Sequence, residues 1–134
     1  MVEQPLSAHV DTFAADRLPP REQWPQLIFN LSRLQYPKRV NCATRLLDRH
    51  VLEGFGKRRC IVAPGPSNAA GKTVTWTYDD LFRHANRIAR VLVEDLGVVP
   101  GNRVLLRGFN SPMLAASWFA VMKAGGIAVT TMPL

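Results

Sequence analysis

The chain has 134 residues, of which 47% are apolar and 20% are charged, and it contains 10 prolines, 9 glycines and 2 cysteines. A chain of this size and composition suits one soluble domain and leaves little room for a second one. Its formal net charge is +7, but the basic excess is spread along the chain. The densest cluster, Lys57 to Arg59, lacks the interleaved aromatic residues that stack bases, so we expect no nucleic-acid partner.

The cysteines, the first residues and the apolar runs of the chain predict where in the cell the protein is located. Cys42 and Cys60 are too few for a disulfide framework and are not spaced as metal ligands, which predicts reduced thiols and a cytoplasmic protein. The first 20 residues contain neither a basic n-region nor an apolar core, so no secretory signal is expected. No apolar run reaches the roughly 18 residues of a membrane span, so we expect no membrane partner.

Residues 1–39 predict an extended, proline-rich N-terminal arm. Their prolines fix φ and remove backbone donors, which breaks any long helix or central strand. The segment nevertheless carries several large apolar side chains, namely Trp24, Leu27, Ile28, Phe29, Leu31, Leu34 and Tyr36. We therefore expect an arm with one short helical turn that packs along a larger body.

From residue 40 onward the apolar periodicity sharpens. Asn41 is placed to cap a helix whose apolar side chains recur every three or four residues, and Gly54 is placed to end it. Two strand-like runs follow at residues 59–63 and 74–77. The loop between them is rich in Gly, Pro, Ser and Asn, which is typical of a β-hairpin.

Thr77 and Asp80 then form a capping-box pattern at the start of a long amphipathic helix. Its apolar face comprises Leu81, Phe82, Ala85, Ile88, Ala89, Leu92, Val93 and Leu96. The opposite face carries Asp79, Arg83, Arg87, Arg90 and Glu94. Gly97 is placed to end this helix.

The last third of the chain predicts a strand at 103–107, a helix at 113–123 and a second strand at 127–131. Asn110 or Ser111 caps the helix, which is apolar almost all round and should be buried on more than one side. This order forms a βαβ unit with parallel strands and a right-handed crossover. Parallel strands need helices on both faces of their sheet, and only two long helices are predicted, so we expect an incomplete α/β domain.

Two sequence patterns approach known catalytic motifs. Gly65, Gly71, Lys72 and Thr73 resemble a phosphate-binding P-loop, but five residues separate the glycines instead of four, and a strand follows instead of a helix. We therefore interpret them as a hairpin loop. Ser67 lies in a near match to a nucleophile elbow that lacks its last glycine and its helix, which favours a turn residue.

The histidines and aromatic residues give no stronger signal. His50 and Glu53 have a spacing that suits a metal, but they lack a third ligand, so we prefer a packed core histidine. His9 lies in the arm, and His84 lies on the polar face of its helix. Five side chains that could form a cofactor box have the spacing of core residues instead: Trp76, Met113, Trp118, Phe119 and Met122. We predict no catalytic, cofactor-binding or metal-binding residue in this chain.

Four blocks of the sequence are similar to the start of the adenylate-forming superfamily of acyl-CoA synthetases, peptide-synthetase adenylation domains and luciferases. They are Trp76 to Leu81, Asn86 to Ala89 with Leu92, Leu96 to Val104, and Val121 to Val129. Shorter stretches resemble the benzoate and 2-aminobenzoate CoA ligases more narrowly. They are Tyr36-Pro37 with Asn41 and Leu46 to His50, and Arg107-Gly108 with Asn110 to Ala115. The matches cover nearly all of residues 22–134.

The resemblance implies that residues 40–134 are the incomplete first part of the AMP-binding domain, the N-terminal part of the family's large α/β domain. The parent enzyme would use ATP and Mg²⁺ to convert an aromatic carboxylate into an acyl adenylate and would then transfer the acyl group to CoA. The family's phosphate loop, adenine-binding aromatic, ribose-binding aspartate and late catalytic lysine have no counterpart here. We therefore expect the fragment to be inactive, to bind none of these cofactors, and to have the remainder of its own polypeptide as its partner.

One residue departs from the family pattern, and one alternative function stays open. Asn102 stands where the family usually has Asp, and we expect no functional consequence from this turn position. The alternative is a free-standing binding module that holds a partner through an exposed sheet edge and an apolar helix face. An unpaired fragment is expected to self-associate or aggregate, whereas an evolved module should behave as one defined species.

Overall fold

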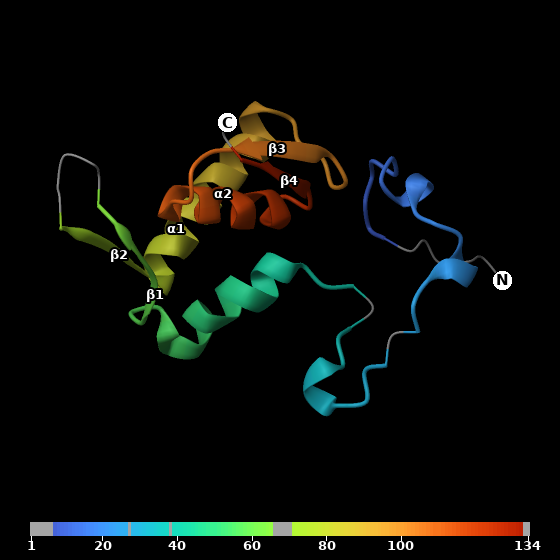
Figure 1. The fold of residues 1–134 in the computed structure, drawn as a ribbon, viewed down its shortest axis with the longest axis horizontal. Helices are drawn as coiled ribbons and strands as arrows, with labels where there is room; N and C mark the ends of the chain where they lie inside the picture. Colours follow the sequence, from blue (N-terminus) through green and yellow to red (C-terminus); the bar gives the residue numbers. More distant parts are fainter. Residues whose placement is uncertain (1–6, 27, 38, 66–70, 133–134) are drawn as a thin grey trace.

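Two small sheets and two long helices form the body of the molecule, and an irregular arm precedes them (Figure 1). The computed structural model describes residues 7–26, 28–37, 39–65 and 71–132. We call residues 41–132 the body and residues 7–40 the arm. In the described part of the chain, no helix is both long and apolar enough to cross a membrane.

The first helical segment of the body begins at Asn41, as expected. The Asn41 Oδ1 atom accepts hydrogen bonds from the backbone N–H groups of Ala43 at 3.0 Å and Thr44 at 3.3 Å, which is a normal N-cap. Gly54 has a φ of 86° and interrupts the helical backbone. Between these ends the segment contains two π-helical turns, Thr44–Asp48 and Val51–Phe55, a winding that apolar periodicity did not predict.

The predicted hairpin is confirmed. Strands β1 (Arg59–Pro64) and β2 (Thr73–Thr77) pair antiparallel, and the Gly65 N–H donates to the Lys72 carbonyl at 2.7 Å. The loop therefore leads from one strand into another, not from a strand into the helix that a P-loop requires. Ser67 lies outside the described residues.

The long amphipathic helix is also confirmed, as α1 (Tyr78–Arg90) followed by a π-helical turn at Val91–Asp95. Both halves of the capping box are present. The Thr77 Oγ1 atom accepts from the Asp80 N–H at 3.2 Å, and the Asp80 carboxylate accepts from the Thr77 N–H at 2.9 Å. Gly97 then adopts a φ of 64°, consistent with its expected place after the helix.

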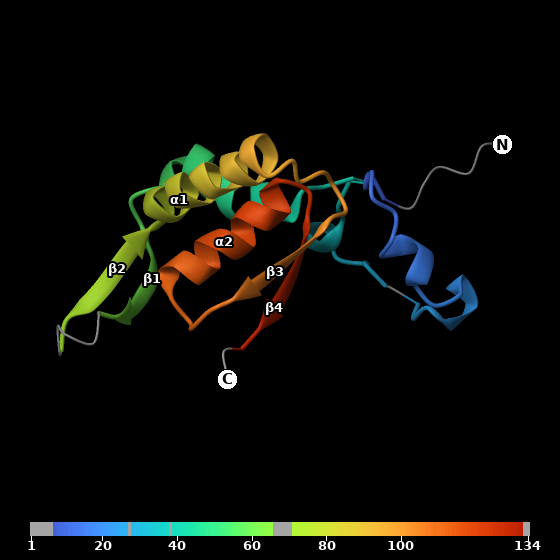
Figure 2. The same cartoon turned by 90° about the horizontal axis from the view of Figure 1, so that it is seen from above.

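The βαβ unit consists of β3 (Arg103–Arg107), α2 (Pro112–Lys123) and β4 (Ile127–Thr131). The strands are parallel, with Arg103 opposite Ile127 and Arg107 opposite Thr131. Ser111 caps α2 by accepting from the Leu114 N–H at 3.1 Å. Helix α2 lies between α1 and the β3–β4 sheet (Figure 2).

Small side chains allow these layers to approach closely. Ala85 of α1 and Ala116 and Ala120 of α2 are completely buried. The first apolar cluster contains Leu47, Leu81, Ala85 and Ala116, and the second contains Leu92, Ala120 and Val121. The core therefore lies where α1, α2 and the inner face of the sheet meet.

One side of α2 and the outer face of the sheet remain uncovered. Leu105 of β3 is 65% exposed, Met113 is 47% exposed and Trp118 is 37% exposed. The expectation that Met113 and Trp118 belong to a packed core is therefore wrong for this chain. Their spacing fits a core helix, but no described element covers that side of α2.

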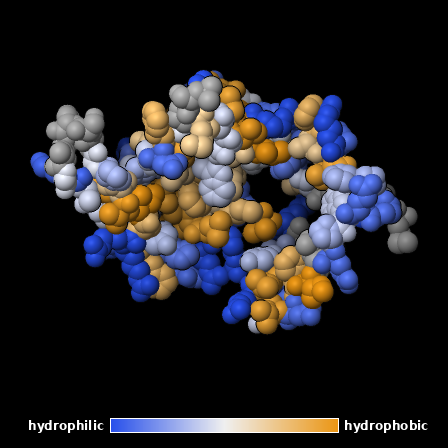
Figure 3. All heavy atoms as spheres, in the orientation of Figure 1, coloured by the Kyte–Doolittle hydropathy of each residue, from blue (hydrophilic) through white to orange (hydrophobic). Residues whose placement is uncertain are grey.

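The arm differs from its expected form. It contains three short 3-10 turns, Ala15–Arg17, Arg21–Gln23 and Ser32–Leu34, instead of one. None of its described residues is buried, and Figure 3 shows apolar side chains exposed on both arm and body. The arm projects away from the body in both views of Figures 1 and 2, because most of its hydrogen bonds are local, such as Trp24 Nε1 to the Pro19 carbonyl at 2.7 Å.

Candidate functional site

Lys123 forms a polar node where three helical segments meet. Its Nζ atom lies 2.5 Å from Asp48 Oδ1 and 2.6 Å from Asn86 Oδ1, and 4.4 Å from the centroid of the Phe82 ring. The side chains of Lys123 and Asp48 are only 11% and 18% exposed. The node thus ties the end of α2 to α1 and to the helix that begins at Asn41.

These contacts make Lys123 a structural cation. Its charge is balanced by one carboxylate, one amide oxygen and the face of an aromatic ring, so the ammonium group is held largely out of the solvent. No local pattern in the sequence marks Asp48, Asn86 and Lys123 as a set. The only signal was that all three fall in the blocks that carry the family resemblance.

Two glycine-containing turns lie side by side at the edge of the sheet where β3 and β4 begin. The Gly101 N–H donates to the Gly125 carbonyl at 2.9 Å, and the Ile127 N–H donates to the Asn102 carbonyl at 2.8 Å. Gly125 has a φ of 76°, and a Cβ atom there would lie 3.0 Å from Pro100 Cβ. Both the backbone conformation and the close approach therefore favour glycine at this position.

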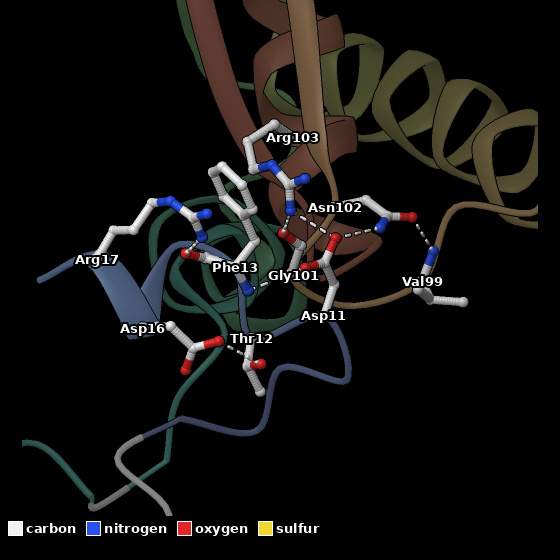
Figure 4. A network of polar contacts seen from close by, with 9 residues as sticks. All are labelled: Asp11, Thr12, Phe13, Asp16, Arg17, Val99, Gly101, Asn102 and Arg103. Atoms are coloured by element: carbon white, nitrogen blue, oxygen red, sulfur yellow. Dashed lines mark hydrogen bonds and ion pairs between the residues drawn. The ribbon is translucent and has the colours of Figure 1, made fainter.

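The arm is anchored to the first of these turns (Figure 4). The backbone N–H groups of Val10 and Asp11 both donate to the Pro100 carbonyl at 2.9 Å. Gly101, with a φ of 97°, lies beneath this contact, and a Cβ atom there would collide with the Asp11 carbonyl. The anchor therefore requires glycine at residue 101.

The Asp11 carboxylate is the polar centre of the anchor. It accepts from the Phe13 N–H at 3.0 Å, from Asn102 Nδ2 at 2.8 Å and from the Arg103 guanidinium. These donors, the Phe13 N–H foremost, hold the pKa of Asp11 below its usual value. Asn102 thus does more than occupy a turn, because an aspartate there would place a second carboxylate against Asp11.

The Phe13 ring completes the anchor. The guanidinium carbon of Arg17 lies 3.6 Å from its centroid, and that of Arg103 lies 4.4 Å away. Cations near an aromatic ring are attracted by its quadrupole. Arm and body therefore share a small cluster of charged and aromatic groups in place of an apolar interface.

A cleft of about 560 Å³ lies between the anchor, the Asn41 cap and the Gly125 turn. It is lined mainly by polar and small residues, among them His9, Arg39, Asn41, Pro100, Lys123 and Gly125. A hollow between arm and body is visible in Figure 3. The cleft combines residues of the arm with residues of the family-like blocks.

The structure does not bring His50 and Glu53 together as ligands. The His50 ring stacks on Tyr78, with centroids 4.9 Å apart, and Glu53 pairs with Arg49. Among the described residues, no group of three or more His, Cys, Asp or Glu side chains could hold a metal ion. These contacts fit the packed histidine that the sequence favoured.

The contacts and exposure of His84, Cys42 and Cys60 give no sign of a reactive group. His84 is half-buried, and its ring stacks on Trp76 with centroids 4.4 Å apart. Cys42 is exposed and Cys60 is half-buried, and both are free thiols. Burial, followed by the charge of Asp80, raises the pKa of Cys60 and so disfavours a reactive thiolate.

Comparisons with known proteins agree with this architecture. A family model described as "AMP-binding enzyme" matches residues 48–134. Acetyl-coenzyme A synthetase of Deinococcus radiodurans is 36% identical over 88 residues, which are 66% of this chain and 13% of that protein.

Two solved structures of the same kind of enzyme resemble the fold. The fatty acid AMP ligase from Legionella pneumophila has a TM-score of 0.59 and 27% identity, over 68% of this chain and 15% of that one. The anthranilate CoA ligase AuaEII, solved with anthranoyl-AMP, has a TM-score of 0.54 and 26% identity, over 66% of this chain and 15% of that one. The chain thus spans less than a sixth of the length of these relatives, in the region of their large N-terminal domain.

Proposed function

The chain belongs to the family of AMP-binding enzymes, and we propose that it forms the N-terminal part of the large domain of an acyl-adenylate-forming ligase. The observation that supports this role is the match of the family model over residues 48–134. The same residues contain the Lys123 node, both glycine turns and the βαβ unit. In this proposal the chain supplies scaffold, and other parts of a longer enzyme supply the reacting groups.

The parent enzyme joins a carboxylic acid to CoA in two steps. The carboxylate attacks the α-phosphorus of ATP and releases pyrophosphate, and the CoA thiolate then attacks the acyl carbon and releases AMP. ATP would supply the AMP leaving group that a carboxylate lacks, and Mg²⁺ would balance the charge of the phosphates. The described residues do not fit these cofactors, since Lys72 follows a hairpin loop and no acidic cluster could hold a metal. We therefore assign no step of the reaction to this chain.

An aromatic acid is the substrate class that we propose for the parent. The support is the likeness to the anthranilate CoA ligase AuaEII, together with the stretches at residues 36–50 and 107–115 that resemble benzoate and 2-aminobenzoate CoA ligases. Relatives named for acetyl and fatty acyl groups mark the competing classes. We also propose a cytoplasmic location, where ATP and CoA are available.

Exchange of labelled pyrophosphate into ATP tests both levels of the proposal. The protein that carries this chain at its N-terminus should catalyse exchange with benzoate or 2-aminobenzoate at least tenfold faster than with acetate or a fatty acid, the order of discrimination that a shaped pocket supplies. Exchange driven only by acetate or a fatty acid would refute the aryl substrate and keep the ligase. Exchange catalysed by residues 1–134 alone would refute the scaffold role.

A binding module on the same scaffold is the second candidate. The observation in its favour is a groove of about 390 Å³ on the uncovered side of α2, lined by Leu114, Trp118 and Phe119 among others. Transcript sequencing and size-exclusion chromatography separate the two candidates. A Ser/Thr/Gly-rich phosphate loop downstream in the same reading frame supports the ligase, whereas a 134-residue product of one defined size supports the module.

A further inference from the structure

The cleft between arm and body has hydrogen-bond acceptors that are already occupied. Asn41, which lines the cleft, already donates from its Nδ2 atom to the Met122 carbonyl at 2.8 Å. The Pro100 carbonyl accepts from Val10 and Asp11, and the Gly125 carbonyl accepts from Gly101. These carbonyl oxygens therefore already accept hydrogen bonds from the protein itself.

By contrast, two side chains that line the same cleft carry hydrogen-bond donors without a partner in the described part of the chain. Within the described ranges, the Arg39 guanidinium and the His9 imidazole make no hydrogen bond, ion pair or ring contact. The residues that line the cleft include no Asp or Glu. The two nearby carboxylates are neutralised, Asp48 by Lys123 and Asp11 by Arg103. The cleft thus combines spare donors with positive charge.

We propose that this cleft binds a small oxyanion, a phosphate or carboxylate group, with Arg39 as its main partner and His9 as a second donor. A guanidinium offers paired N–H donors whose planar geometry matches both kinds of oxyanion. The volume of about 560 Å³ lies within the usual range for small-molecule sites. The site is separate from the acyl-adenylating chemistry and does not depend on the proposed function.

The anchor at Asp11 explains why such a site needs the arm. His9 is held two residues before the Asp11 carboxylate and next to the two backbone hydrogen bonds to Pro100. Arg39 enters from the other end of the arm, two residues before the Asn41 cap. A bound oxyanion would therefore bridge the two ends of the arm across the body.

Titration of the ¹⁵N-labelled chain by NMR tests the proposal. Sodium phosphate and, separately, sodium acetate should shift the amide signals of Val40 and Gly125 saturably, whereas sodium chloride at equal ionic strength should not. Saturation by phosphate alone identifies a phosphate site, and saturation by acetate as well identifies a general oxyanion site. Saturation by neither salt, or equal shifts with chloride, would overturn the proposal.

Two arginine variants provide the matched comparison. Arg39→Gln should weaken binding about tenfold, the effect of losing one charge-assisted contact. Arg33→Gln removes the same charge from an exposed arm residue outside the cleft and should change affinity less than twofold. Equal weakening in both variants would show attraction to net charge and would refute a defined site.

Discussion

The body and the arm of this chain are stabilised by different kinds of interaction. The body buries Leu47 and Val121 almost completely and encloses the Lys123 ion pair, whereas no described residue of the arm is buried. The arm depends on one polar anchor around Asp11. The resemblance to ligases is therefore carried by a packed scaffold, and the arm is an attachment whose geometry a few hydrogen bonds decide.

Among the substitutions that test this contrast, replacement of Lys123 should cause the largest loss of stability. Lys123→Met strands the Asp48 carboxylate in a half-buried position, and breaking such a pair from one side costs about 3–5 kcal/mol. Urea denaturation should show most of the stability of a small domain lost.

Two controls sharpen this experiment. Arg90→Met breaks an exposed pair with Glu94 and should change the urea midpoint very little, because solvent screens exposed ion pairs. The double variant Lys123→Met/Asp48→Leu removes both charges and should recover much of the loss. If Lys123→Met is no worse than Arg90→Met, the node is not a stabilising element.

The capping box of α1 should give the next largest effect, and it should depend on pH. The Thr77 backbone N–H, its hydroxyl and then Arg83 lower the pKa of Asp80 from 3.8 to about 2. A carboxyl with a depressed folded pKa stabilises the fold above its unfolded value, and this contribution disappears as pH falls from about 4 to 2. Asp80→Asn should therefore cost about 1 kcal/mol at pH 7 and almost nothing at pH 2.

Thermal unfolding at the two pH values measures this difference. Asp95→Asn is the matched control, because Asp95 lies exposed near the end of the same helical segment and carries the same charge without a capping bond. A cost for Asp80→Asn that stays constant from pH 7 to pH 2 would contradict the role of the carboxylate.

The anchor should show the reverse of the node, with a large local effect and no global one. Asp11→Ala removes the acceptor for Asn102 and Arg103, so the arm should detach while the urea midpoint of the body stays unchanged. Hydrogen exchange at the Val10 amide should rise to that of a free chain, and exchange at Ile127 should not change. Asp16→Ala, which breaks only a bond to Thr12 within the arm, should leave both amides protected.

Local signals in the sequence predicted most of the body. Caps at Asn41, Thr77 and Ser111 and a glycine at residue 97 fixed where helices begin and end, because these signals act over a few residues. The π-helical winding after Asn41 and the extra turns of the arm leave no comparable pattern.

The site residues were harder to predict for the same reason. Lys123 meets Asn86 across 37 residues, and Asp11 meets Asn102 across 91. Such pairs depend on the tertiary fold and carry no periodic signal. Membership in family-like blocks marked Asn86 and Lys123, but nothing marked Asp11, which lies in the arm before those blocks begin.

Exchange of a single side-chain amide for a carboxylate at residue 102 tests the polar contacts of the anchor most directly. Asn102→Asp restores the residue that the family usually has, but it removes the amide donor and sets a second carboxylate beside Asp11. Arg103 can balance one of these charges and not both, so the Val10 amide should lose protection at pH 7. Two adjacent carboxyls raise the pKa of one of them, so a proton taken up on mild acidification should restore the anchor.

The wild-type anchor should respond to acid with the opposite sign. The pKa of Asp11 is lowered in the folded chain, so its hydrogen bonds persist above the usual value and are lost only as pH falls below it. Exchange at Val10, corrected for intrinsic rates, should therefore slow between pH 7 and 5 in Asn102→Asp and stay level in the wild type. Parallel profiles would mean that the backbone bonds to Pro100 hold the arm without help from the Asp11 carboxylate.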